Sequence, residues 1–384
     1  MARGSVRPRR AIDRERFQDY VAIALIALAS RAICFLVGIV ALAGAPTPDS
    51  LSARDVLALM ERWDAGYYWT IAVSGYDTPL PDADAEGTLQ AFFPVYPLVI
   101  RGTMAITRLD HLAAGVVAST LLFVAALLVI REYVRELGMP REVGIAAVVL
   151  IAFAPHSFVF GAIYTESTFL LLLAAAMLAL RRRQYLAAGV AAALLSATRP
   201  NGIIFVVFAL AWTLRTMGWR PLAMPWTAPG PMLTIVLAPL GLVAYWWYCF
   251  VTTGDAFAQA SAMTHIWGWA PDWPWVNLRN HFAGNAIERF WVAGSVLFFM
   301  ASLLLLRFRM YEEFVFCLAC FLLNWISVLP NSLVRYALVL FPIFIGLARA
   351  TAGRPVALAV MTGAFAAVNG LLMAAFALKW HVAI

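Results

Sequence analysis

Charged residues are scarce in this chain. Asp, Glu, Lys and Arg together make up only 13% of its 384 residues, whereas hydrophobic residues make up 63%. A water-soluble domain contains about 25% charged and about 45–50% apolar residues. The mean hydropathy of +0.81 points in the same direction. The composition therefore excludes a soluble globular protein and predicts an integral membrane protein whose helices pack within lipid.

Lysine is almost absent. Lys379 is the only one, and arginine supplies the rest of the positive charge. The formal net charge of +7 would suit a nucleic-acid-binding protein if the basic residues formed one surface. They are instead distributed over a basic tail (residues 1–19) and short loops between apolar runs. Basic residues in such places set the orientation of a membrane protein, so we expect membrane lipids and no nucleic acid as partners.

Cysteine is also rare, and all four cysteines (Cys34, Cys249, Cys317 and Cys320) lie inside apolar runs. Cys317 and Cys320 have the C-x-x-C spacing of a redox or metal motif. No charged residue or histidine stands beside them to lower a thiol pKa, so we interpret all four as buried hydrophobic residues. We expect no cleavable signal peptide, because the first apolar run, residues 20–43, is too long for one and predicts a membrane anchor.

Eleven apolar runs are candidates for membrane-spanning helices, which need about 17–25 residues. Arginines in the N-terminal tail and in alternate turns place those parts on the cytoplasmic side, because positive charge is retained there. We expect an all-α bundle with the N-terminus inside and the C-terminus outside. The predicted spans are residues 20–43, 112–130, 143–161, 163–180, 184–198, 202–216, 231–251, 288–306, 313–329, 334–349 and 355–378.

One further apolar segment, residues 92–108, is not predicted to cross the membrane. It contains Pro94, Pro97 and Arg101. If it crossed, the arginines that follow the next span would fall on the wrong side. We therefore expect a juxtamembrane helix lying at the outer face.

This topology predicts one transmembrane domain over residues 1–384, with two long outer loops. The first, residues 44–111, gathers most of the acidic residues of the outer side. The second, residues 252–287, contains four tryptophans that could form either an interfacial belt or a platform for a lipid chain or sugar ring. The acidic residues of the first loop are Asp49, Asp55, Glu61, Asp64, Asp77, Asp82, Asp84 and Glu86, and the tryptophans of the second are Trp267, Trp269, Trp273 and Trp275.

Ionisable residues near a membrane are costly, so they are candidates for function. Those of the outer turns also have structural interpretations. Asp64 could cap the helix that follows it. Glu166 could pair with Arg199 or Arg62. Arg199 and Arg335 could extend from helix ends towards the interface, and His156 could be a hydrogen-bonded interior residue. Their concentration on one side favours a site.

Six segments together resemble the family that includes the GPI mannosyltransferase acting at the second mannose, with its bacterial relatives. RWDxxYY, FFPxYP and YTES are the most specific of the motifs, and the segments follow the family's order over most of the chain. The segments are RWDAGYYWTIAVSGY (62–76), FFPVYPLVIR (92–101), APHSFVFGAIYTESTF (154–169), ATRPNG (197–202), TTGDAFAQASAMTHIW (252–267) and LVRYALVLFPIFIGLA (333–348).

The resemblance implies a multi-spanning glycosyltransferase of the GT-C class. Such an enzyme takes a sugar from a polyprenyl monophosphate carrier and works on the non-cytosolic face. It uses a carboxylate in the first outer loop, a position that Asp64 matches. Glu166 falls where the class often keeps a second acidic residue, and residues 92–108 match an outer-surface helix that follows the first carboxylate.

These residues suggest an inverting displacement in which Asp64 is the general base, assisted by Glu166, and the acceptor hydroxyl attacks the anomeric carbon. Arginine forks bind phosphate bidentately. We expect Arg199 and Arg335 to hold the donor phosphate, with Arg62 and Tyr336 as second choices. The substrate-binding candidates in the same outer segments are Trp63, Tyr67, Tyr164, His156 and Asn201.

No cofactor or metal ion is required by this scheme. Asp82-Ala83-Asp84 has the spacing of a metal-binding Asp-x-Asp pair, but its acidic surroundings, flanked by Pro and Gly, are typical of a solvated loop.

The expected donor is a polyprenyl-phosphate-linked hexose, with mannose suggested by the resemblance. The acceptor could be a glycan, a lipid or a protein, and the expected location is a bacterial inner membrane with the site facing outwards. The competing hypothesis is a transporter or flippase of a lipid-linked or anionic substrate. Inverted internal repeats, which many transporters have, are not visible in the sequence.

Overall fold

The computed structural model describes residues 9–44, 52–78 and 88–383, and within these residues the fold is all-α without strands. The helices are α1 (Arg9–Ala43), α2 (Ala53–Ala58), α3 (Ala65–Ser74), η2 (Thr88–Ala91), α4 (Val95–Thr107), α5 (His111–Glu136), α6 (Arg141–Phe153), η3 (Ser157–Gly161), α7 (Glu166–Arg181), α8 (Tyr185–Ser196), η4 (Pro200–Ile204), α9 (Phe205–Met217), α10 (Arg220–Ala223), η5 (Pro225–Thr227), α11 (Pro229–Leu237), α12 (Leu240–Thr253), α13 (Ala258–Trp267), α14 (Pro274–Phe282), α15 (Ala286–Arg307), α16 (Tyr311–Trp325), α17 (Leu333–Leu338), α18 (Pro342–Ala350), α19 (Pro355–Ala377) and η6 (His381–Ala383).

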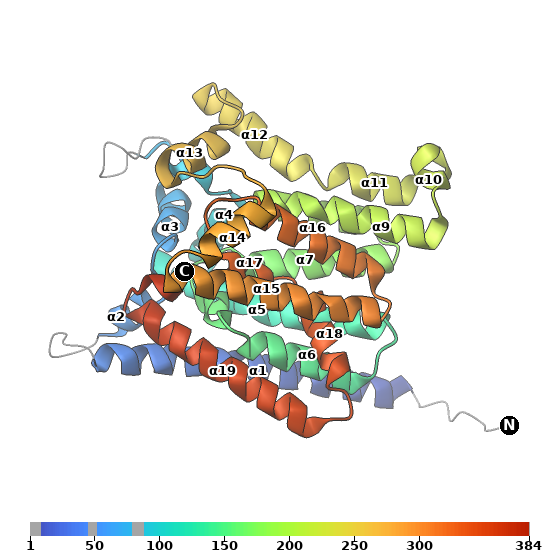
Figure 1. Ribbon diagram of the computed structural model, residues 1–384, viewed down its shortest axis with the longest axis horizontal. Coiled ribbons are helices and arrows are strands. Elements are labelled where there is room, and N and C mark those ends of the chain that lie inside the picture. Colours follow the sequence, from blue (N-terminus) through green and yellow to red (C-terminus); the bar gives the residue numbers. More distant parts are fainter. Residues whose placement is uncertain (1–8, 45–51, 79–87, 384) are drawn as a thin grey trace.

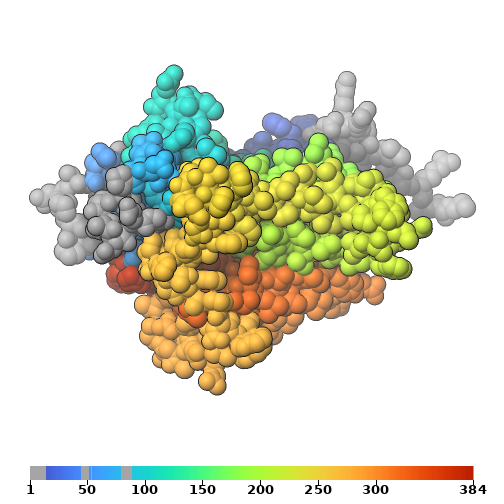
Figure 2. All heavy atoms as spheres, turned by 90° about the horizontal axis from the view of Figure 1, so that it is seen from above, coloured from blue at the N-terminus to red at the C-terminus, as the bar shows by residue number. Residues whose placement is uncertain are grey.

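The long helices run side by side across the view of Figure 1. Helix α5 packs against α7, α7 packs against α8, and α19 closes the other side of the bundle against α1. Helices α2, α3 and α13 lie with the C-terminus at one end of the bundle, here called the site end. The beginning of α1 and helix α10 lie at the opposite end, here called the tail end. Figure 2 looks onto the face formed by α11, α12 and α13.

Six helical segments in the described part of the chain are long and apolar enough to cross a membrane. All eleven predicted spans contain helix, so the predicted multi-spanning α-helical architecture is confirmed. The other five are interrupted or shorter, and their crossing remains a prediction. The six segments are Arg14–Ala43, His111–Glu136, Pro200–Met217, Pro229–Thr253, Ala286–Arg307 and Pro355–Ala377.

Prolines interrupt three of the predicted spans. The predicted span 143–161 leaves α-helix at Phe153, two residues before Pro155, and the span 231–251 divides into two helices at Pro239. The span 334–349 divides before Pro342. Proline lacks the N–H that an internal helical hydrogen bond requires and restricts the residue before it, which explains each break.

The segment predicted to lie outside the membrane, residues 92–108, forms α4, a helix of 13 residues. At about 1.5 Å per residue this helix is about 20 Å long, which is short of the roughly 30 Å apolar thickness of a bilayer. It packs against α3 and α5. Arg101 binds the end of α3 by donating to the carbonyl oxygens of Ala72 at 2.7 Å and Ile71 at 3.3 Å. Because helix α8 of a predicted span is shorter still, with 12 residues, length does not decide this point and the juxtamembrane position of α4 stays a prediction.

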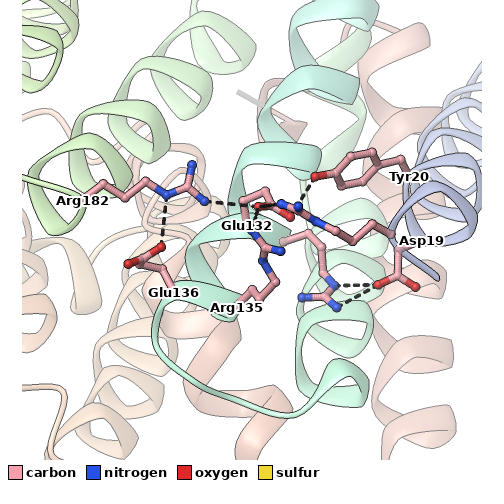
Figure 3. A network of polar contacts seen from close by, with 8 residues as sticks. Asp19, Tyr20, Glu132, Arg135, Glu136 and Arg182 are labelled. Atoms are coloured by element: carbon pink, nitrogen blue, oxygen red, sulfur yellow. Dashed lines mark hydrogen bonds and ion pairs between the residues drawn. The ribbon is translucent and has the colours of Figure 1, made fainter. Parts of the chain in front are cut away.

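A network of ion pairs joins four helices at the tail end (Figure 3). Asp19 of α1 pairs with Arg131 of α5 at 2.8 Å and with Arg141 of α6 at 2.5 Å. Glu132 of α5 pairs with three arginines from three helices and also accepts a hydrogen bond from a tyrosine hydroxyl. Those partners are Arg16 at 2.9 Å, Arg135 at 2.5 Å, Arg182 at 3.2 Å and Tyr20 at 2.8 Å.

Glu312 and Glu313, which begin α16, extend this network. Arg181 of α7 pairs with both glutamates, at 2.9 and 2.5 Å. Arg215 of α9 also pairs with Glu312, and the Tyr133 hydroxyl donates to Glu313 at 2.6 Å. The arginine-rich turns that the sequence assigns to one side therefore meet at one end of the bundle. The carboxylates that neutralise them were not predicted.

A buried arginine within α1 was also missed. Arg31 donates to the carbonyl oxygen of Ala152 and to the Ser157 hydroxyl, each at 3.0 Å, and lies 4.8 Å from the Phe123 ring centre. The oxygen of Ala152 belongs to the last turn of α6, where carbonyl groups lack helical partners. Arg31 therefore compensates for the break between α6 and α7.

Candidate functional site

Asp64 stands directly before α3 at the site end. The residue occupies the N-cap position, but its side chain makes no capping hydrogen bond. Arg335 of α17 donates instead from Nη2 to Asp64 Oδ2 at 3.2 Å. The carboxylate retains 30% side-chain exposure. Capping, the structural alternative for Asp64, is therefore not what the structure shows.

Glu166, the first residue of α7, is fully buried behind Asp64. Its Oε1 lies 3.0 Å from Arg335 Nε and 2.6 Å from Arg199 Nη2. Of the two pairings predicted for Glu166, the one with Arg199 is present. Asp64, Arg335, Glu166 and Arg199 thus form a chain of alternating charges contributed by four separate parts of the sequence.

Aromatic rings enclose the two cations of this chain. Arg335 lies 4.8 Å from the ring centre of Tyr164, and Arg199 lies 5.2 Å from that of Tyr336. Cations near aromatic faces are stabilised by the ring quadrupole. Burial is the largest influence on the pKa of Arg199 and would lower it, but Glu166 acting together with Tyr68 and Tyr336 raises the pKa overall. Arg199 therefore remains a cation, available to an anionic ligand.

Three polar atoms at this site are buried without a hydrogen-bond partner: Glu166 Oε2, Arg199 Nη1 and Asn201 Oδ1. A buried polar atom without a partner is costly, and most such atoms in folded proteins are paired. Two of these atoms accept hydrogen bonds and the third donates. Such a set can bind a ligand that carries both hydroxyl groups and negative charge.

A cavity of about 420 Å³ opens beside these residues. This volume lies within the range of small-molecule sites, which is about 300–1,000 Å³. Charged, neutral polar and aromatic side chains all contribute to its wall. The charged members are Asp64, Arg199 and Arg335, the neutral polar members include Asn201, Gln259, Asn324, Asn331 and Ser332, and the aromatic members are Tyr68, Phe92, Phe93, Trp267, Trp269 and Tyr336.

Two residues beside the charged chain have left-handed backbone conformations that are uncommon for residues other than glycine. Trp63, directly before Asp64, has φ of 55°, and Ser332, directly before α17, has φ of 69°. Such conformations cost energy and are found frequently at functional sites, where the surrounding structure holds them. Both turns present a charged side chain of the site, Asp64 and Arg335 respectively.

The remaining predicted residues occupy different positions. Tyr336 and Asn201 line the cavity. Tyr67 lies behind its aromatic wall, with its ring stacked 4.5 Å from Phe92 and 6.0 Å from Trp267 in an edge contact. Substrate binding by Tyr67 and Asn201 therefore stays a prediction. Phosphate binding by Tyr336 stays a prediction as well.

Besides Glu166 and Tyr67, four predicted residues are not among those lining this cavity: Arg62, Trp63, His156 and Tyr164. Arg62 Nε is buried without a hydrogen-bond partner. His156 is fully buried, with its ring 6.0 Å from that of Phe158, and neither of its ring nitrogens has a partner. His156 and Tyr164 are buried, whereas Arg62 and Trp63 are partly exposed, and the predicted roles of all four residues stay predictions.

The tryptophans of the second outer loop divide into two groups. Trp267 and Trp269 line the cavity. Trp273 and Trp275 are exposed by 65% and 63% and stack on each other with ring centres 4.9 Å apart. Trp267 and Trp269 therefore lie where a platform for a substrate is expected. Trp273 and Trp275 are exposed, as interfacial anchors are.

The possible metal motif Asp82-Ala83-Asp84 lies outside the described residues. Within the described ranges, no group of three or more His, Cys, Asp or Glu side chains could hold a metal ion. The cysteine prediction is confirmed, because all four cysteines are free and buried.

Sequence reasoning missed several residues of the cavity wall. Tyr68 stands four positions after Asp64, and this spacing on a helix places the two side chains on the same face. Burial raises its pKa above the ordinary value, so Tyr68 stays protonated and can donate a hydrogen bond. Asn324 is the single polar residue in the apolar run FLLNW, which was a second usable signal. Gln259 and Met263 lie in segment 252–267, one of the six that carry the family resemblance, but neither was singled out as a site residue.

No protein-family description and no curated protein sequence matches the chain. Among solved structures, the chain is similar to the crystal structure of the Archaeoglobus fulgidus oligosaccharyltransferase tethered with an acceptor peptide containing the NVT sequon. The two share 14% sequence identity with a TM-score of 0.42, over 93% of this chain and 54% of the other. The chain thus spans about half the length of that protein, and its own activity must be argued from the site.

Proposed function

We propose that this protein is a membrane glycosyltransferase of the GT-C class that moves a hexose from a polyprenyl monophosphate carrier to an acceptor hydroxyl. One observation carries the proposal. A partly exposed carboxylate, Asp64, shares a small-molecule cavity with two buried arginines, Arg199 and Arg335. This combination supplies a base for the acceptor and positive charge for a phosphate leaving group. Mannose is the sugar that the family resemblance favours.

In the proposed reaction, Asp64 accepts the proton of the acceptor hydroxyl while its oxygen bonds to the anomeric carbon. The bond between that carbon and the phosphate oxygen breaks, and its electron pair remains with the lipid phosphate. General-base assistance of this kind contributes about 10²–10⁴-fold to a rate. A single displacement inverts the anomeric centre, so a β-linked donor would give an α-linked product.

The ion pairs assign unequal tasks to the two arginines. Arg335 already contacts both carboxylates, whereas Arg199 has a free Nη1 atom and contacts Glu166 alone. Arg199 is therefore our first candidate for the phosphate, and Arg335 keeps the charge of Asp64 and Glu166 balanced. Phosphate binding to arginine is short and strong because both partners are charged. Glu166 would act on the reaction by holding the arginines.

The wall of the cavity is suited to the other parts of the substrates. Phe93, Met263 and Leu329 are apolar wall residues that could contact the first units of a lipid carrier, and Trp267 and Trp269 offer flat faces to a sugar ring. The acceptor hydroxyl could belong to a glycan, a lipid or a protein. The proposed location of this reaction is the outer face of a bacterial inner membrane, which is the side that the arginine pattern of the sequence predicts.

The tail-end network favours an enzyme over a transporter or flippase. Alternating access would require the tail end to open. Several of its carboxylates, Asp19, Glu312 and Glu313, are almost fully buried in ion pairs that join separate helices. Opening this end would have to separate several of these ion pairs at once, which a transport cycle would repeat at every turnover.

The test is a sugar-transfer assay with purified protein in lipid nanodiscs, using radiolabelled β-mannosyl phosphoryl polyprenol and a panel of glycan and lipid acceptors. Asp64→Asn is expected to reduce turnover at least 100-fold and to leave donor binding within threefold. Asp77→Asn is the matched control, because Asp77 is an exposed carboxylate of the same loop that does not line the cavity.

Near-normal turnover by Asp64→Asn would reject Asp64 as the base. Donor that crosses a vesicle membrane without forming a glycoside would instead support the transporter hypothesis.

A further inference from the structure

Two distant segments contact the turn that carries Asp64. One is the segment before α7, and the other is η6 near the C-terminus. At the centre of the turn Trp63 has a left-handed backbone, with φ of 55°. A bulky residue does not adopt this conformation without support from its surroundings. The contacts that supply the support therefore decide where the Asp64 carboxylate lies.

The first support is Tyr164, which precedes α7. Its hydroxyl donates to the carbonyl oxygen of Arg62 at 2.8 Å. The adjacent backbone N–H of Ile163 donates to the carbonyl oxygen of Met60 at 3.1 Å. Two hydrogen bonds thus fasten the segment directly before Asp64 to the start of α7, where Glu166 lies.

The ring of Tyr164 also contacts the guanidinium group of Arg335. Arg335, the cation that pairs with Asp64, lies 4.8 Å from its centre. Tyr164 is 1% exposed and does not line the cavity. One buried side chain therefore touches both the turn that carries the carboxylate and the arginine that holds this carboxylate, without access to a substrate.

The second support comes from the C-terminal segment. The ring of Trp63 lies 4.9 Å from that of His381 in η6. The η6 segment is itself attached to α15 through Trp291, whose Nε1 donates to the carbonyl oxygen of Val382 at 3.3 Å. Trp63 thus has a contact with the C-terminal segment that is separate from the hydrogen bond of Tyr164 to Arg62.

We propose that Tyr164 is a positioning residue that sets the Asp64 carboxylate and Arg335 in register, and that His381 assists it through Trp63. This assignment replaces substrate binding as the role of Tyr164 and Trp63, and it rests on the proposed glycosyl transfer. Misplacement of a catalytic group by about 1 Å can reduce a rate about 100-fold. Loss of the Tyr164 hydroxyl should therefore affect turnover more than donor binding.

The experiment compares Tyr164→Phe with Tyr133→Phe in the transfer assay, together with thermal unfolding of both variants. Tyr133 is an equally buried tyrosine at the tail end, and its hydroxyl donates to Glu313 at 2.6 Å. Tyr164→Phe loses one hydrogen bond, and Tyr133→Phe loses two because the Tyr133 hydroxyl also accepts from Arg181 Nε at 2.8 Å, so both variants should lower the unfolding temperature. Only Tyr164→Phe is expected to lower kcat, by about tenfold, with the donor KM within twofold.

A second variant, His381→Ala, keeps the proposal testable if Tyr164→Phe is poorly folded, because His381 is on the surface. We expect a threefold to fivefold fall in kcat, an order-of-magnitude figure for a partial loss of positioning. Three results for Tyr164→Phe would each overturn the positioning role. They are a wild-type kcat, a fall in kcat no larger than that of Tyr133→Phe, and a raised KM without a change in kcat. Transfer that disappears in Asp64→Asn while Tyr164→Phe is unaffected would leave the proposed function standing. Absence of transfer by the wild type would reject both proposals.

Discussion

Arg335 Nη2 lies 3.2 Å from Asp64 Oδ2, although 271 positions separate the two residues in the sequence. The same guanidinium lies 3.0 Å from Glu166 through its Nε atom. One arginine therefore links the partly exposed carboxylate of the cavity to a fully buried one. The same cation therefore balances the charge of both carboxylates.

Glu166→Gln is expected to destabilise the protein by about 3 kcal/mol, because it leaves Arg199 and Arg335 with an uncompensated buried charge. Thermal or denaturant unfolding in nanodiscs measures the change. Glu288→Gln is the matched control, since Glu288 is 27% exposed in its pair with His281 and should cost about 1 kcal/mol or less. Equal effects of the two variants would contradict the energetic importance of the buried charge chain.

Substitution of Arg199 should weaken donor binding in a graded manner. Arg199→Ala removes a charge-assisted hydrogen bond worth about 1.5–3 kcal/mol, so the donor KM should rise about 10–100-fold. Arg199→Lys keeps the charge but loses the fork, and an intermediate increase is expected. Titration with the donor lipid measures this series, with Arg289→Ala as an exposed arginine control. An unchanged donor KM in Arg199→Ala would remove Arg199 from the phosphate site.

Sugar transfer should persist in excess chelator, because Arg199 and Arg335 already provide positive charge beside Asp64. The measurement is the rate after prolonged incubation with EDTA. Replacement of both Asp82 and Asp84 by Asn should likewise leave the rate unchanged. Activity that disappears with chelator and returns with Mg²⁺ or Mn²⁺ would show that a cation completes the site.

Glu313→Gln should separate stability from activity. Glu313 is fully buried at the tail end and pairs with Arg181. Its loss should lower the free energy of unfolding by about 3 kcal/mol. Because the cavity lies at the opposite end, kcat per folded molecule should stay at the wild-type value. A parallel loss of kcat and stability would indicate that the two ends are energetically coupled.

The sequence was informative about the site because charge in a membrane protein is confined to few places. Once the arginine-rich turns had set the orientation, Asp64, Glu166, Arg199 and Arg335 fell on one side, and the structure brings these four residues together. Charged residues of a membrane protein are kept near one surface or the other, and the order of spans assigns the surface. The sequence could therefore predict that these four residues lie close together.

Side-chain partners could not be predicted in the same way. Arg31 lies in the middle of an apolar run. Its partners Ala152 and Ser157 follow 121 and 126 positions later in the sequence. The role of Tyr164 depends on the backbone carbonyl oxygen of Arg62. Every residue has such an oxygen, so the sequence does not indicate which one is used. Such contacts depend on how helices rotate and approach, and sequence periodicity does not specify this rotation.

The burial of Arg31 has a consequence for biosynthesis. Helix α1 is made before α6, so its arginine reaches the bilayer before Ala152 and Ser157 have been synthesised. An arginine at the centre of a spanning helix costs about 2.5–3.5 kcal/mol on insertion. Until α6 is present, the apolar residues of α1 must offset this cost without the acceptors that α6 and Ser157 provide. Once α6 has been inserted, the arginine gains its acceptors, and the N-terminal helix becomes attached to the bundle instead of remaining an independent anchor.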